Sequence, residues 1–114
     1  MASSVRMTVE WLVPVGQARP MTMALHSLAS DVRKQRGCVG CSVSTDLSSR
    51  GAVRYVEEWQ SEDELRSRLL SDAFLRLAAL MDDVVQPPRI EFALAGGTRG
   101  FDFIEEVRGG GVSR

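Results

Sequence analysis

Hydrophobic and polar residues alternate along several short stretches of this chain. One side of the stretch 5–13 carries the hydrophobic residues Val5, Met7, Val9, Trp11 and Val13. Alternation of this kind predicts a β-strand with one buried face. The same pattern predicts strands at about residues 39–45, 53–59 and 90–94, and residues 101–107 are a candidate fifth strand.

Two other segments repeat their hydrophobic residues at helical spacing. The first runs from Pro20, which suits a first helical position, towards Gly37, which suits a helix end. The second begins at Ser61, which forms a capping box with Glu64, and its apolar stripe predicts one long helix as far as Val84.

These elements follow the order β-α-β-β-α-β. That order predicts an α+β, ferredoxin-like βαββαβ fold with a four-stranded antiparallel sheet and two helices on one face. We expect residues 5–107 to form a single domain, between a disordered N-terminus (1–4) and a disordered C-terminal tail (108–114). The other face of the sheet is mixed and would meet water or a second subunit. It carries Arg6, Thr8, Glu10, Ser42, Ser44, Arg54, Val56 and Glu58.

Composition narrows the class of protein. A chain of 114 residues with 44% hydrophobic and 25% charged residues is typical of one globular domain. A net charge of −1 argues against nucleic-acid binding, since the only tight basic cluster, Arg33, Lys34 and Arg36, lies where a helix would end and complements its dipole. No stretch reaches the roughly 20 apolar residues of a membrane span, and no signal peptide is visible, so we expect a cytoplasmic protein with reduced thiols.

Glu57 is the first candidate for chemistry, because strand parity places it on the apolar face between Tyr55 and Trp59. An unpaired buried carboxylate is costly. Glu57 would therefore pair with Arg68 or Tyr55, act as a base towards a phenol, or sit solvated at the rim of a pocket.

Arg68 has two interpretations of its own. It is either an electrophilic group that holds a phenolate oxygen, or an exposed helix residue that pairs with Glu64 four positions earlier. An aromatic set is either plain core or the lining of a cavity for a flat ligand. That set is Trp11, Tyr55, Trp59, Phe74 and Phe92.

The remaining metal and redox candidates are weaker. His26 is the only histidine and falls beside the apolar stripe of the first helix. Cys38 and Cys41 have CxxC spacing, but no second pair exists for zinc, and residues three apart on a strand point to opposite faces. We therefore expect no metal and no cofactor.

The sequence resembles the antibiotic biosynthesis monooxygenase family over roughly residues 5–95. The matching features are Gly37-Cys38, Glu57-x-Trp59, Ser71 and Phe74. Where the family usually carries a helix histidine, this chain has Arg68.

The resemblance implies a dimeric α+β barrel, with two sheets packed face to face and a pocket between each sheet and its own helices. It also implies a homodimer that oxidises a flat phenol or quinol without a cofactor. Strand parity and the resemblance together suggest Glu57 as the base and Arg68 as the partner of the oxyanion. The alternative is a non-catalytic ligand-binding or assembly domain of the same fold, which the missing histidine favours.

Overall fold

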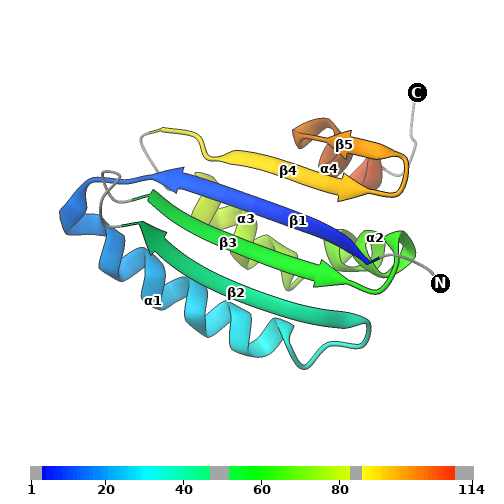
Figure 1. The fold of residues 1–114 in the computed structure, drawn as a ribbon, viewed down its shortest axis with the longest axis horizontal. Helices are drawn as coiled ribbons and strands as arrows, with labels where there is room; N and C mark the ends of the chain where they lie inside the picture. Colours follow the sequence, from blue (N-terminus) through cyan, green and yellow to red (C-terminus); the bar gives the residue numbers. More distant parts are fainter. Residues whose placement is uncertain (1–3, 47–51, 83–85, 110–114) are drawn as a thin grey trace.

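One antiparallel sheet carries the helices on a single face (Figure 1). The computed structural model describes residues 4–46, 52–82 and 86–109. The strands are β1 (Val5–Leu12), β2 (Cys38–Asp46), β3 (Ala52–Trp59), β4 (Arg89–Leu94) and β5 (Gly97–Arg99). The helices are α1 (Val15–Val32), α2 (Glu62–Leu70), α3 (Phe74–Asp82) and α4 (Phe101–Arg108).

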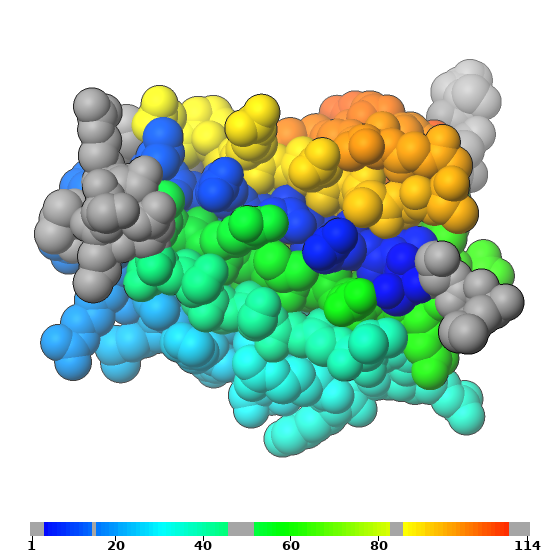
Figure 2. All heavy atoms as spheres, in the orientation of Figure 1, coloured from blue at the N-terminus to red at the C-terminus, as the bar shows by residue number. Residues whose placement is uncertain are grey.

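The strand order is β2-β3-β1-β4-β5, so β1 and β3 lie in the middle. This is the predicted ferredoxin-like α+β fold with a short fifth strand added at one edge. The hydrophobic alternation in β1 fixes the register, because its odd-numbered side chains are all buried under the helices. The core therefore fills the space between the sheet and the helices, and the even-numbered side chains of β1 lie on the open face seen in Figure 2.

The single long helix predicted from Ser61 is wrong, because Ser71 divides it into α2 and α3. Ser71 leaves the helical conformation, with φ −75° and ψ 154°. Its hydroxyl donates to the carbonyl of Arg68 at 2.7 Å and accepts from the amide of Phe74 at 3.2 Å. A serine side chain that satisfies both helix ends stabilises the break. The predicted start of α2 is confirmed, since Ser61 Oγ accepts from the amide of Glu64 at 3.2 Å.

The candidate fifth strand at residues 101–107 is also wrong. Those residues form α4, and the fifth strand is the three-residue β5 just before it. Phe103 and Val107 are buried four positions apart, which is helical spacing. Gly97 has φ +132°, a conformation open mainly to glycine, and it turns the chain from β4 into β5.

Several smaller boundaries differ from expectation. Helix α1 begins at Val15, so Pro20 lies inside it, and α1 ends at Val32 rather than at Gly37. Gly37 has φ +88° and lies in the turn before β2. The expectations for residues 1–3, 83–85 and 110–114 lie outside the described residues.

Candidate functional site

Strand β3 turns its odd-numbered side chains towards the helices. Val53, Tyr55, Glu57 and Trp59 have exposed fractions of 0–1%. Glu57 is therefore a fully buried carboxylate between two aromatic residues, as strand parity predicted.

Arg68 reaches Glu57 from α2 and pairs with it. Arg68 Nη2 donates to Glu57 Oε2 at 2.7 Å, and Arg68 Nε lies 3.1 and 3.2 Å from the two carboxylate oxygens. Arg68 itself is only 2% exposed, so the interpretation as a solvated partner of Glu64 is wrong. The two charges instead compensate one another inside the core.

Two neighbours on the same strand complete the coordination of the carboxylate. Tyr55 Oη donates to Glu57 Oε2 at 2.5 Å, and Trp59 Nε1 donates to Glu57 Oε1 at 3.0 Å. Both oxygens thus accept from charged or polar donors, which is how a buried carboxylate is stabilised as the anion. A further donor can bond to Glu57 only by displacing one of these donors.

The surroundings of this group affect its other titratable members. Burial, and then the negative charge of Glu57, raises the pKa of the Tyr55 hydroxyl well above its ordinary value. Burial acts to lower the pKa of Arg68, but the hydrogen bonds and charge of Glu57 outweigh it, and the pKa of Arg68 is raised. At neutral pH, Tyr55 is therefore neutral and Arg68 is charged.

One part of the Arg68 guanidinium remains unused. Its Nη1 is buried and meets no hydrogen-bond partner among the residues that the structure describes. The guanidinium carbon lies 5.7 Å from the centre of the Phe74 ring, the first residue of α3. A buried donor without a partner is costly, and in native proteins it often marks a place where water or a ligand binds.

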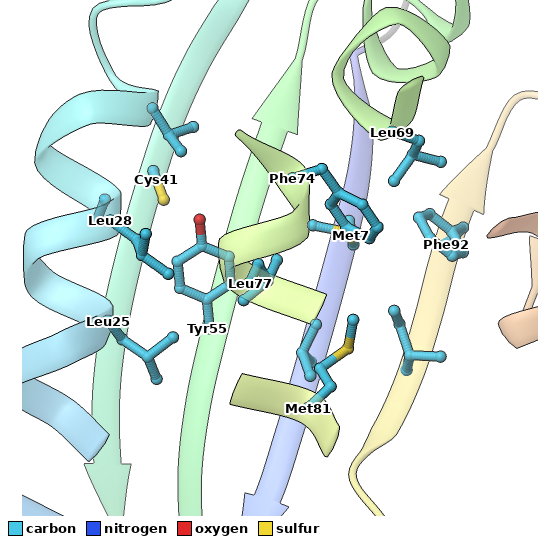
Figure 3. Close-up of a cluster of buried hydrophobic side chains, with 14 of the residues drawn as sticks. Met7, Leu25, Leu28, Cys41, Tyr55, Leu69, Phe74, Leu77, Met81 and Phe92 are labelled. Atoms are coloured by element: carbon cyan, nitrogen blue, oxygen red, sulfur yellow. The ribbon is translucent and has the colours of Figure 1, made fainter. Parts of the chain in front are cut away.

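The predicted aromatic set does not gather at one place. Tyr55, Trp59 and Phe74 lie around the Glu57–Arg68 pair. Phe92 is two strands away, opposite Met7 on β1 (Figure 3). Its ring packs 4.9 Å from that of Phe103. Trp11 is buried four positions further along β1 than Met7, and its Nε1 also lacks a partner within the described part of the chain.

A separate hollow lies on the open face of the sheet. Its volume is about 480 Å³, and it is lined by Thr8, Glu10, Arg54, Arg89, Ile90, Glu91, Thr98 and Arg99. Two smaller hollows, of about 210 and 170 Å³, lie beside Thr98–Arg99 and beside Pro87. None of these three hollows is lined by Glu57 or Arg68. The hollow on the open face is not predicted from the sequence, although the mixed polar pattern of that face was its visible signal.

The two thiols lie on the same face, which corrects the expectation from their spacing. A bulge in β2 between Cys38 and Gly40 places Cys38 opposite Trp59 and Cys41 opposite Glu57, both facing the helices. Burial raises the pKa of the Cys41 thiol to about 11, and it also raises the pKa of Cys38. Cys41 lies beside the hydroxyl of Tyr55 (Figure 3). Weakly acidic thiols are poor nucleophiles and poor metal ligands.

Other candidates receive no structural support as a site. His26 is exposed on α1. Within residues 4–46, 52–82 and 86–109, no three His, Cys, Asp or Glu side chains are grouped so that they could hold a metal ion. In the same ranges, no helix is both long and apolar enough to cross a membrane.

Comparison with solved structures supports the fold. A conserved protein from Methanosarcina mazei Go1 superposes with a TM-score of 0.70 at 20% identity, over 82% of this chain and 93% of that one. A protein from Shewanella oneidensis gives 0.69 at 19% identity, over 81% and 90%. A structure described as an antibiotic biosynthesis monooxygenase gives 0.65 at 16% identity, over 77% and 94%.

Sequence comparison assigns the family. Among curated proteins, none matches this chain. Residues 4–80 match the family described as Antibiotic biosynthesis monooxygenase, and this segment contains β1 to β3 and the Glu57–Arg68 pair. The chain therefore belongs to the antibiotic biosynthesis monooxygenase family.

Proposed function

We propose that this protein is a monooxygenase-like enzyme that takes a flat phenol or quinol between its sheet and its helices and oxidises it without a cofactor. The observation that carries the proposal is the buried Arg68, which is fixed by Glu57 and whose Nη1 meets no partner within residues 4–46, 52–82 and 86–109. A fixed cation in a dry site is suited to stabilise the negative charge that develops on a phenolic oxygen.

In this mechanism Glu57 is the base and Arg68 is the partner of the oxyanion. The hydroxyl of the substrate replaces one donor on Glu57, either Tyr55 or Trp59, and gives its proton to the carboxylate. The electron-rich anion then reduces dioxygen. For an anthrone-like substrate, a CH₂ group becomes C=O, and the second oxygen atom leaves as water with the two hydrogens. The substrate-binding residues in this proposal are Tyr55, Trp59 and Phe74, with Trp11 and Phe92 further along the same layer.

Entry of a ring system requires the helical layer to move. Trp59 and Phe74 are 1% exposed and fill the space beside the ion pair. The break at Ser71 provides a hinge, because α2 and α3 are separate helices joined by three residues.

The same packing favours a second candidate, a non-catalytic ligand-binding or assembly domain. Every oxygen of Glu57 is already bonded, and buried aromatic rings occupy the place of a substrate. In that case the ion pair has a structural role only, and ligands would bind on the surface.

The proposal includes a cytoplasmic homodimer formed through the open face of the sheet. Paired positions across β1 and its neighbours place Arg6 opposite Glu58, and Glu10 between Arg54 and Arg89. Alternating charges of this kind are self-complementary across a twofold axis. Analytical ultracentrifugation tests the dimer, and a monomer at micromolar concentration would contradict it.

Oxygen uptake tests the catalytic proposal. An anthrone or quinol is added to the protein in chelator-treated buffer, and dioxygen is followed with an electrode. We expect uptake in the wild type and its loss in Glu57→Gln. Glu105→Gln is the matched control, since Glu105 is an exposed glutamate on α4, away from Glu57 and from the open face of the sheet. Activity that survives in folded Glu57→Gln would remove Glu57 from the mechanism, and no uptake by the wild type would favour the second candidate.

A further inference from the structure

Helix α4 packs directly against α2, which carries Arg68. Phe103 and Val107 are its buried residues. The guanidinium groups of Arg66 and Arg99 lie over the Phe103 ring, at 5.0 and 5.3 Å from its centre. The family match ends at residue 80, so α4 lies outside the matched segment.

The contact that matters most for the site is made by the last residue of α4. Arg108 Nη1 donates to the backbone carbonyl of Leu69 at 2.6 Å. Leu69 lies in the last turn of α2, where carbonyl groups lack partners within the helix. A cation at this end also complements the helix dipole. Arg108 therefore holds the backbone of α2 at the residue next to Arg68.

Surface ion pairs support the same arrangement. Arg66 on α2 reaches Glu106 on α4 at 3.1 Å, and Glu106 also pairs with Arg99 at 2.9 Å. Such partly exposed pairs contribute little individually and are weakened by salt. The Arg108–Leu69 bond is shorter, at 2.6 Å, and it acts directly on the backbone of α2.

We infer that Arg108 is a positioning residue that holds the end of α2 against the sheet, so that Arg68 stays on Glu57. Opening of the layer at Ser71 requires this bond to break, and α4 thereby controls access to the buried group. The inference rests on the proposed function, because holding Arg68 matters to activity only if Arg68 meets a ligand.

Hydrogen exchange of the ligand-free protein provides the test. The Nε–H of Arg68 and the indole N–H of Trp59 both bond to Glu57 and can be followed by NMR. We expect Arg108→Ala to speed exchange of both by about tenfold, equivalent to about 1.4 kcal/mol. Backbone amides that pair β1 with β3 should keep their rates, because the sheet does not depend on α4. Arg108→Lys, which keeps the cation, should restore most of the protection.

Arg76→Ala is the matched control, since Arg76 makes an exposed ion pair with Asp31 on the far side of the helical layer. It should leave the Arg68 and Trp59 rates within twofold of wild type. The inference is overturned if Arg108→Ala leaves both rates within twofold, or if it speeds the β1–β3 amides equally. If Arg108→Ala does not fold, Arg108→Gln takes its place, and we expect the same faster exchange of the Arg68 and Trp59 N–H groups. The exchange measurement uses no substrate, so it tests the role of Arg108 even if the protein oxidises no phenol or quinol.

Discussion

Replacing Arg68 by methionine should show how strongly the buried ion pair governs stability. Methionine has a similar length and flexibility but no charge. The variant leaves the carboxylate of Glu57 buried with only Tyr55 and Trp59 as donors. Removing one partner of a fully buried pair costs about 3–5 kcal/mol. That is a large part of the roughly 5–15 kcal/mol by which a domain of this kind is stable.

Urea unfolding followed by circular dichroism measures this loss. We expect the midpoint to fall sharply in Arg68→Met while the slope m stays constant. Adding Glu57→Gln to Arg68→Met should recover stability, because the double variant has no uncompensated charge, and the double-mutant cycle isolates the coupling between the two residues. Arg76→Met, at an exposed pair with Asp31, should cost less than about 1 kcal/mol. A cost for Arg68→Met as small as that of Arg76→Met would refute the reasoning.

Three further predictions concern neighbours of the pair. Tyr55 is the only tyrosine, so absorbance near 295 nm reports it alone. The pKa of Tyr55 is raised in the folded protein, so the contribution of its hydroxyl to stability is complete below about pH 10 and is lost above that pH. We therefore expect the phenolate to appear only when the protein unfolds. Titration of Tyr55 near pH 10 in the folded protein would contradict this expectation. With a thiol reagent at pH 8, half-buried Cys38 should react well before Cys41, whose pKa is raised from 9.0 to about 11. The contribution of the Cys41 thiol to folding stability is lost as the pH rises from 9.0 to about 11. Equal reaction rates of the two thiols would contradict the difference in their burial. Trp59→Phe should cost more than Trp11→Phe in urea unfolding, because the Trp59 indole N–H bonds to Glu57, whereas that of Trp11 meets no partner among the residues described. The reverse order would contradict this assignment.

The strand pattern could be predicted from sequence because it has a period of two. The alternation in β3 is sufficient to predict that Glu57 is buried between Tyr55 and Trp59. The partner of Glu57 could be narrowed only to Arg68 or Tyr55, and both in fact bind it. The role of Trp59 as a donor was missed, although its place on the same face as Glu57 was visible.

Other features depend on local hydrogen bonds, side-chain packing and a strand bulge, which periodicity does not encode. The hydrophobic stripe continues across Ser71, so the break between α2 and α3 is apparent only from the hydrogen bonds of that serine. The spacing of Phe101 and Phe103 fits a strand as well as a helix. In the structure these residues belong to α4, and Phe103 packs against Phe92. One extra residue in the β2 bulge reverses the predicted orientation of Cys38 relative to Cys41.

The central claim is that a flat aromatic ligand meets the Glu57–Arg68 group between sheet and helices. Its most direct test is an NMR titration of the full chain with a hydroxyanthraquinone, following the Nε–H of Arg68, the indole N–H of Trp59 and the amides of Thr8 and Thr98. We predict that the Arg68 and Trp59 signals shift together and saturate, while Thr8 and Thr98, which line the open-face hollow, stay in place. Shifts confined to Thr8 and Thr98, or no shifts at all, would contradict the account.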